Sequence, residues 1–181
     1  MTASTSPLPM HLRPYRLGVG VAAFNKEGQV FIAERMDIPG AWQLPQGGIT
    51  LQEIETSLVD AALRELYEET GMQNVTPLAI TKDWVHYDFN EDKGYVPGHS
   101  HKYRGQRQKW IAVVYEGKDK DINLECHEEE IEFKQWKWID LSDITDHIVP
   151  FKRHIYEFVI DRFSYIANKT QPDLSKVLKL S

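Results

Sequence analysis

Cysteine is almost absent from this 181-residue chain, and long apolar segments are absent altogether. The single cysteine, Cys126, has no partner for an internal disulfide and lies in an acidic stretch without metal-ligand spacing. The longest apolar stretches have the length of a strand, and residues 1–14 contain neither a cationic start nor an apolar run. We therefore expect a soluble, cytoplasmic protein with no disulfide framework, no secretory signal and no membrane partner.

Positive charge is also scarce, because 21 Lys and Arg residues stand against 27 Asp and Glu residues, which gives a formal charge of -6. The protein as a whole should repel nucleic acid, so we expect no DNA partner and only a local contact with RNA. The charges are segregated, with acidic clusters at 65–69 and 125–132 and basic clusters at 102–109 and 152–153. Such segregation suits a site that holds a polyanion, although ordinary solvated faces give the same pattern.

Two common phosphate and metal motifs are missing. Gly47-Gly48 precedes a carboxylate-bearing segment, where a Walker-type phosphate loop would carry a Lys-Ser pair. His99 and His101 form the only close histidine pair, and no Cys or third His stands at ligand spacing from them. We expect this pair to belong to a solvated loop.

The pattern of apolar residues predicts one domain, an α+β or mixed α/β sandwich. Strands are predicted at 17–24 and 29–33, joined by a hairpin turn, and at 78–85, 109–115 and 133–138. Helices are predicted within 58–70, where Gly71 provides the end, and from Pro150 to Ile166. This order favours a sheet with helices on both faces. We expect the domain to span 15–166, between a flexible segment at 1–14 and a loosely held tail at 167–181.

Three carboxylates in the first predicted helix indicate a hard metal ion. Glu65, Glu68 and Glu69 stand at positions i, i+3 and i+4, and a helix places such residues on one face, about 5 to 6 Å apart. Their repulsion costs a few tenths of a kcal/mol per pair and should raise the pKa of at least one carboxyl group. A divalent cation such as Mg²⁺ would relieve both effects and leave room for phosphate oxygens and an attacking water. The spacing alone would be explained more simply by a solvated acidic helix face.

The neighbouring residues favour the metal site. The segment GGITLQEIETSLVDAALRELYEETGM, at 47–72, resembles the motif of the Nudix hydrolases, G-x5-E-x7-R-E-U-x-E-E-x-G-U with U apolar. The half that begins at Arg64 matches at every fixed position. The resemblance implies an α/β/α sandwich with a mixed sheet and cleavage of a pyrophosphate linkage next to a nucleotide. It also implies that Glu65, Glu68 and Glu69 bind Mg²⁺, for which Mn²⁺ or another divalent cation would substitute.

The first half of the motif departs from the family. Glu53 follows Gly47 at the family spacing, but ten residues then separate Glu53 from Arg64, where the family has seven. Either Glu53 or Glu55 fills the place of the first glutamate, whose role in the family is mostly to support the loop through Arg64. We expect the insertion to form an enlarged loop at 49–56, with one of these two glutamates turned toward Arg64.

Four further segments resemble one Nudix subgroup, the bacterial RNA 5′ pyrophosphohydrolases and plant-type dinucleoside tetraphosphate hydrolases. They are WQLPQGG at 42–48, YRGQRQKW at 103–110, EF before WKW at 132–138, and VPFKR at 149–153. Because they occur in the same order as in the subgroup, the resemblance covers most of the chain from Arg16 to Arg162.

The same resemblance assigns roles outside the motif. It implies a phosphate contact for Arg16 and a carboxylate that completes the metal site at Glu132. The nucleobase would lie among Arg35, Tyr87 and Phe151, since stacking on aromatic or guanidinium planes tolerates any base, at roughly 1 to 3 kcal/mol each. Core packing accounts for Phe151 and Tyr87 about as well as base stacking does.

Two further cations are predicted to hold phosphate. Arg107 and Lys109 belong to a group of four cations within 102–109, and in an extended strand their side chains point to the same face. This arrangement suits the negative charge of an oligophosphate. An exposed basic edge strand, which guards against aggregation, would carry the same residues.

Together these features predict a Mg²⁺-dependent enzyme that hydrolyses a nucleoside 5′-polyphosphate end by in-line attack of water. We assign catalysis to Arg64 and the three helix glutamates, with Glu69 as the first candidate for the general base and Glu132 as the second. Triphosphorylated RNA would lose pyrophosphate and keep a 5′-monophosphate, whereas diadenosine tetraphosphate would yield ATP and AMP. The segments at 105–110 and 151–153 favour RNA.

A hypothesis of another class is a nucleotide-binding regulatory module without hydrolytic activity. Such modules usually lack metal-ligand glutamates, and this chain retains all three in its motif. Neither the oligomeric state nor the preferred base is predicted by the sequence.

Overall fold

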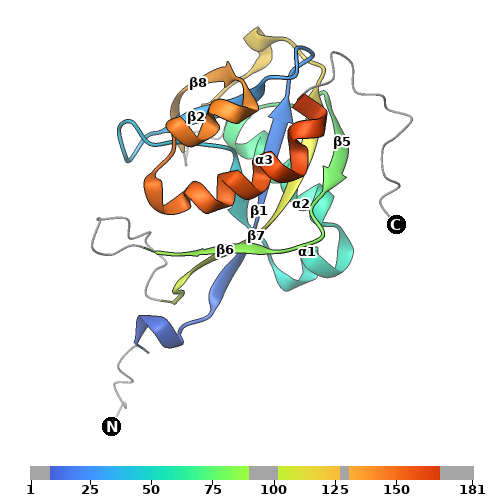
Figure 1. The fold of residues 1–181 in the computed structure, drawn as a ribbon. Coiled ribbons are helices and arrows are strands. Elements are labelled where there is room, and N and C mark those ends of the chain that lie inside the picture. The colour runs from blue at the N-terminus through green and yellow to red at the C-terminus, as the bar shows by residue number, and fades with distance from the viewer. Residues whose placement is uncertain (1–8, 90–101, 127–130, 168–181) are drawn as a thin grey trace.

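The computed structural model describes residues 9–89, 102–126 and 131–167 (Figure 1). The strands are β1 (Tyr15–Phe24), β2 (Val30–Arg35), β3 (Trp42–Gln43), β4 (Gln46–Gly48), β5 (Val75–Ile80), β6 (Val85–Asp88), β7 (Gly105–Tyr115) and β8 (Phe133–Ile139). The helices are α1 (Leu51–Thr56), α2 (Leu58–Thr70) and α3 (Arg153–Ala167), with 3-10 turns η1 (Met10–Leu12), η3 (Asp119–Asp121), η4 (Leu141–Asp146) and η5 (Pro150–Lys152). The histidine pair at 99 and 101 lies outside the described residues.

The strands form one mixed sheet in the order β3-β2-β1-β7-β5, to which β4, β6 and β8 are added on β1, β7 and β2. Strands β1 and β7 run parallel, from Tyr15 opposite Gly105 to Phe24 opposite Val114. The other pairs are antiparallel. The long β1–β7 pair therefore forms the centre on which the shorter strands are built.

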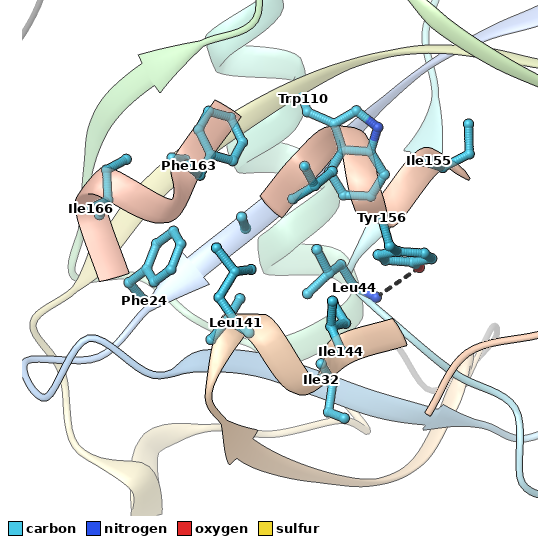
Figure 2. Packing of buried hydrophobic residues seen from close by; sticks show 14 of the residues in the cluster. Phe24, Ile32, Leu44, Trp110, Leu141, Ile144, Ile155, Tyr156, Phe163 and Ile166 are labelled. Atoms are coloured by element: carbon cyan, nitrogen blue, oxygen red, sulfur yellow. Dashed lines mark hydrogen bonds between the residues drawn. The ribbon is translucent and has the colours of Figure 1, made fainter. Parts of the chain in front are cut away.

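Helices cover both faces of this sheet, as the sequence predicts. Residues of β1 alternate between two buried clusters: Val19 and Val21 pack with Leu66 of α2, whereas Phe24 packs with Phe163 of α3. Figure 2 shows the cluster on the α3 face, in which the backbone N–H of Leu44 donates to the hydroxyl of Tyr156 at 3.2 Å. In the part of the chain that the structure describes, no helix is long and apolar enough to cross a membrane.

Local sequence explains both ends of the helix that carries the glutamates. At its start, the Ser57 side chain accepts a hydrogen bond from the backbone N–H of Asp60. At its end, Gly71 adopts a left-handed conformation with φ of 67°, which a residue without a side chain reaches at little cost. The predicted helix 58–70 is confirmed at both boundaries.

Two predictions of local structure are wrong. The insertion in the motif is not an enlarged loop, because Thr50 and Glu53 form a capping box that starts the short helix α1. The strand predicted at 78–85 is two strands, β5 and β6, which pair with different parts of β7. The extended conformation is interrupted between β5 and β6, where the Thr81 hydroxyl donates to the Asp83 carbonyl and accepts from the Trp110 N–H.

Candidate active site

Two glycines allow charged side chains to lie directly against strand β4. A Cβ atom on Gly47 would overlap the carboxylate of Glu65, and a Cβ atom on Gly48 would overlap the guanidinium of Arg16. The two glycines alternate along β4, so they face opposite sides of the sheet. The backbone at 47–48, the glycine cradle, thus lies between the carboxylate of Glu65 and the guanidinium of Arg16.

Glu69 is the most buried of the three helix glutamates, with 8% of its surface exposed. Its carboxylate accepts a hydrogen bond from the backbone N–H of Gln46 at 3.1 Å. Burial raises the pKa of Glu69 well above its ordinary value, and the negative charges of Glu132 and Glu65 raise it further. The charge of Glu132, which is distant in the sequence, thus acts on Glu69, and its role as a metal ligand stays a prediction.

Arg64 holds the other carboxylates. Its guanidinium lies 2.9 Å from oxygens of Glu53, Glu65 and Glu68, and a second contact with Glu53 is made from Nε at 3.2 Å. Glu55 is exposed on α1. The structure therefore settles the choice between the two candidates in favour of Glu53.

The carboxylates fit a divalent cation by their chemistry. All are oxygen donors, and the buried Glu69 lies in the repulsive field of its neighbours, which a cation would relieve. Within residues 9–89, 102–126 and 131–167, no three acidic, His or Cys side chains are already gathered as metal ligands. Glu65 and Glu68 are instead paired with Arg64. Binding of a cation would therefore compete with these ion pairs.

Two of the residues assigned to the base, Tyr87 and Phe151, lie in or against the cluster on the α3 side of the sheet. The rings of Tyr87 and Phe151 are 6.0 Å apart. Tyr87 is 2% exposed and belongs to the hydrophobic core, whereas Phe151 is half-buried beside it. Arg35 is connected to them through Gln43, whose side-chain oxygen accepts from Arg35 Nη1 at 3.3 Å and from the Lys152 ammonium beside Tyr87 at 3.4 Å.

Gln43 and Lys152 were not predicted as residues of the site. Lys152 is almost fully buried, with its Nζ 4.9 Å from the centre of the Tyr87 ring and 3.4 Å from the Gln43 oxygen. The Gln43 oxygen also accepts from Gln46, whose own oxygen accepts from Gln108 at 2.8 Å. The repeated glutamines in WQLPQGG and GQRQKW are the sequence feature that could have indicated these hydrogen-bonded side-chain amides.

Arg107 and Lys109 point to one face of β7, as predicted, and both lie over the ring of Trp84, at 5.7 and 5.6 Å from its centre. The Lys109 ammonium donates to the carbonyl oxygen of Thr81 at 2.9 Å and to that of Lys82. Burial lowers the pKa of Lys109. Lys109 thus holds the connection between β5 and β6, and phosphate binding by these two cations stays a prediction.

Comparisons with known proteins agree with the motif. The model of the NUDIX domain matches residues 14–159. An RNA pyrophosphohydrolase of Bartonella bacilliformis is 44% identical over 165 residues, which cover 84% of this chain and 94% of that protein. One of Rhodospirillum rubrum is 44% identical over 155 residues, which cover 85% and 90%.

The fold is shared with a solved Ap4A hydrolase of C. elegans in a binary complex, with a TM-score of 0.59 and 16% identity over 83% of this chain and 98% of that one. At this identity the likeness shows the fold alone. Nudix hydrolases generally use divalent cations, which agrees with the oxygen donors around Glu69. The chain belongs to the NUDIX domain family and is a Nudix hydrolase.

Proposed function

We propose that this protein removes pyrophosphate from the 5′-triphosphate end of RNA and leaves a 5′-monophosphate. The observation that carries the proposal is the buried carboxylate of Glu69, which lies within the electrostatic reach of Glu65 and Glu132 beside the glycine cradle. The relatives named RNA pyrophosphohydrolase support the choice of substrate, because they match more than four fifths of the chain. The protein would act on such RNA in the cytoplasm.

A divalent cation, Mg²⁺ or Mn²⁺, would be held by Glu65, Glu68, Glu69 and Glu132. When bound, it would neutralise phosphate oxygens and lower the pKa of a coordinated water. Arg64, which Glu53 anchors, keeps two of these carboxylates in place along α2. The protein itself thus supplies both the carboxylates that would bind the metal and the Arg64 guanidinium that orients two of them.

Glu69 is our first candidate for the general base and Glu132 the second. Glu69 is buried and accepts a backbone hydrogen bond from Gln46, whereas Glu65 and Glu68 are paired with Arg64. In the reaction, the water oxygen bonds to phosphorus, the anhydride P–O bond breaks, and pyrophosphate leaves. The proton of the water passes to the carboxylate.

Substrate binding is assigned to cations and aromatic rings around this centre. Arg16 lies against Gly48 and would contact the phosphates. Arg35 and Phe151, with Tyr87 behind Phe151, would hold the base by stacking. Because all these contacts concern one terminal nucleotide, they are compatible with the net negative charge of the chain. We further propose that residues 15–166 form the catalytic domain and that 1–14 and 167–181 are loosely held.

Hydrolysis of a 5′-triphosphate oligonucleotide and of diadenosine tetraphosphate should be compared at equal concentration. The proposal expects the higher kcat/KM with RNA, with pyrophosphate and a 5′-monophosphate end as products. A higher value with diadenosine tetraphosphate, giving ATP and AMP, would favour the alternative. Binding of nucleotide without hydrolysis of either substrate would favour a regulatory module.

A further inference from the structure

We propose that Asp37 is a positioning residue. It fixes the orientation of the Arg35 guanidinium, and the nucleobase of the substrate stacks on the planar face of that group. This inference rests on the proposed function, because it concerns the nucleotide-binding part of the same site. It adds a residue to that part which neither the motif nor the resemblance identifies, and it gives that residue a role in recognition of a base.

The contacts of Arg35 define the plane of its side chain. Nε donates to one oxygen of Asp37 at 2.7 Å and Nη2 donates to the other at 2.6 Å, so the two side chains form a bidentate pair. Nη1 donates to Gln43 from the remaining side at 3.3 Å. Since N–H groups lie in the plane of a guanidinium, these contacts fix its orientation from its edges.

Asp37 can hold this position because its loop is anchored. The carboxylate of Glu34, only 6% exposed, accepts from the backbone N–H of Gly40 at 2.7 Å and from the amide of Gln135 at 2.5 Å. The backbone N–H of Met36 donates to the Glu132 carbonyl at 2.8 Å. The loop between β2 and β3 is thus tied to strand β8 and to the backbone of a proposed metal ligand.

The geometry separates two ways in which an arginine binds a nucleotide. A phosphate would need N–H groups of the guanidinium, and Asp37 and Gln43 accept from three of the five, including the pair on Nε and Nη2 that suits a bidentate anion. A base would meet the face, where stacking does not use the N–H groups. The charge of Asp37 also offsets that of Arg35, so the polyphosphate is not drawn toward the base position. Asp37 would therefore favour binding of a base over binding of a bare phosphate chain.

The test compares the binding of a nucleotide with the binding of its phosphate chain alone. Calorimetry with Mg²⁺ present gives the Kd of α,β-methylene ATP, which resists hydrolysis at that bond, and of inorganic tripolyphosphate. The proteins are the parent, Asp37→Ala and the matched control Asp161→Ala. Asp161 is an exposed aspartate that also pairs with an arginine, Arg162, at 3.3 Å on α3.

In the parent and in Asp161→Ala, we expect the nucleotide to bind about 5- to 150-fold more tightly than tripolyphosphate, the range given by stacking of one base. In Asp37→Ala this ratio should fall at least about threefold, while the Kd of tripolyphosphate stays level or decreases. Arg35→Lys should lose a similar factor, and the double variant Arg35→Lys/Asp37→Ala should lose no more than Arg35→Lys alone. Such non-additivity would not follow from a general loss of stability.

An unchanged ratio in Asp37→Ala, or additive losses in the double variant, would overturn the role of Asp37. So would a parent that does not distinguish the nucleotide from tripolyphosphate. RNA hydrolysis measured on the same preparations separates this result from the proposed function. If no preparation cleaves the 5′-triphosphate oligonucleotide but the ratio still falls in Asp37→Ala, RNA is the wrong substrate and Asp37 keeps its role.

Discussion

Replacement of Glu69 by glutamine should separate catalysis from stability. Glu69→Gln keeps the shape of the side chain and an oxygen that accepts from the Gln46 N–H, but it removes the negative charge. The turnover number should fall at least about a hundredfold, which corresponds to about 2.7 kcal/mol of barrier, the scale expected for the loss of a general base. The metal-free protein should not be destabilised, because the lost charge is buried among like charges.

The stability of Glu69→Gln relative to the parent should also depend on pH, and the sign of this dependence follows from the structure. The pKa of Glu69 is raised above the ordinary 4.5, mainly by burial, so the folded protein holds this proton more tightly than the unfolded chain. The bound proton therefore stabilises the folded protein. This stabilisation is fully present at a pH below the pKa of Glu69 in the unfolded chain, and it is lost as the pH rises through the pKa in the folded protein. Each unit of difference is worth about 1.4 kcal/mol. The stability of Glu69→Gln relative to the parent should therefore increase with pH.

The assay is thermal unfolding in EDTA at pH 5 and pH 8, together with kcat on both candidate substrates with Mg²⁺. For a chain of this length, 1 kcal/mol shifts the melting temperature by about 2 to 4 °C. Glu27→Gln, an exposed change in the turn after β1, is the matched control and should alter neither quantity. The reasoning is refuted if Glu69→Gln retains most of its turnover, or if its melting temperature falls relative to the parent as the pH rises.

Removal of the metal should abolish turnover in EDTA, and either Mg²⁺ or Mn²⁺ should restore it; full activity in EDTA would contradict a metal-dependent mechanism. Glu53→Gln should lower kcat modestly, because it loosens Arg64, whereas Glu55→Gln should match the parent; equal losses in a kinetic assay would show that the Glu53–Arg64 contact has no special role. Arg107→Ala should raise KM and leave kcat and the melting temperature unchanged. Lys109→Ala should also cost about 1 kcal/mol of stability, because it removes a hydrogen bond to the Thr81 carbonyl; identical melting curves for the parent and the two variants would exclude this second role.

The elements that could be predicted from the sequence are those whose signal is local and periodic. In β1, successive residues such as Val21 and Ala22 point to opposite faces and pack into different hydrophobic clusters on the two sides of the sheet. In α2, the apolar residues Ala62 and Leu66 repeat on one side, and Gly71 marks the end. Such patterns depend on neighbours in the chain, so a single sequence contains them in full.

The features that escaped prediction depend on partners far away in the chain. The break between β5 and β6 is fixed by Lys109 and Trp110, which hydrogen bond to residue 81 from another strand. The buried position of Lys152 depends on Gln43, more than a hundred residues earlier. No window of local sequence contains both members of such a pair, and only a recurrent residue type, here glutamine, hints at them.

The insertion in the motif shows why spacing alone does not identify a functional residue. Glu53 lies eleven positions before Arg64, so a count back from Arg64 does not reach it at the family spacing. The capping box with Thr50 turns the extra residues into helix α1, which shortens the path in space, since a helix rises only about 1.5 Å per residue. The Glu53 carboxylate then meets the guanidinium of Arg64 at 2.9 Å. In this chain the insertion therefore leaves a carboxylate beside Arg64, because local capping brings Glu53 back to that place.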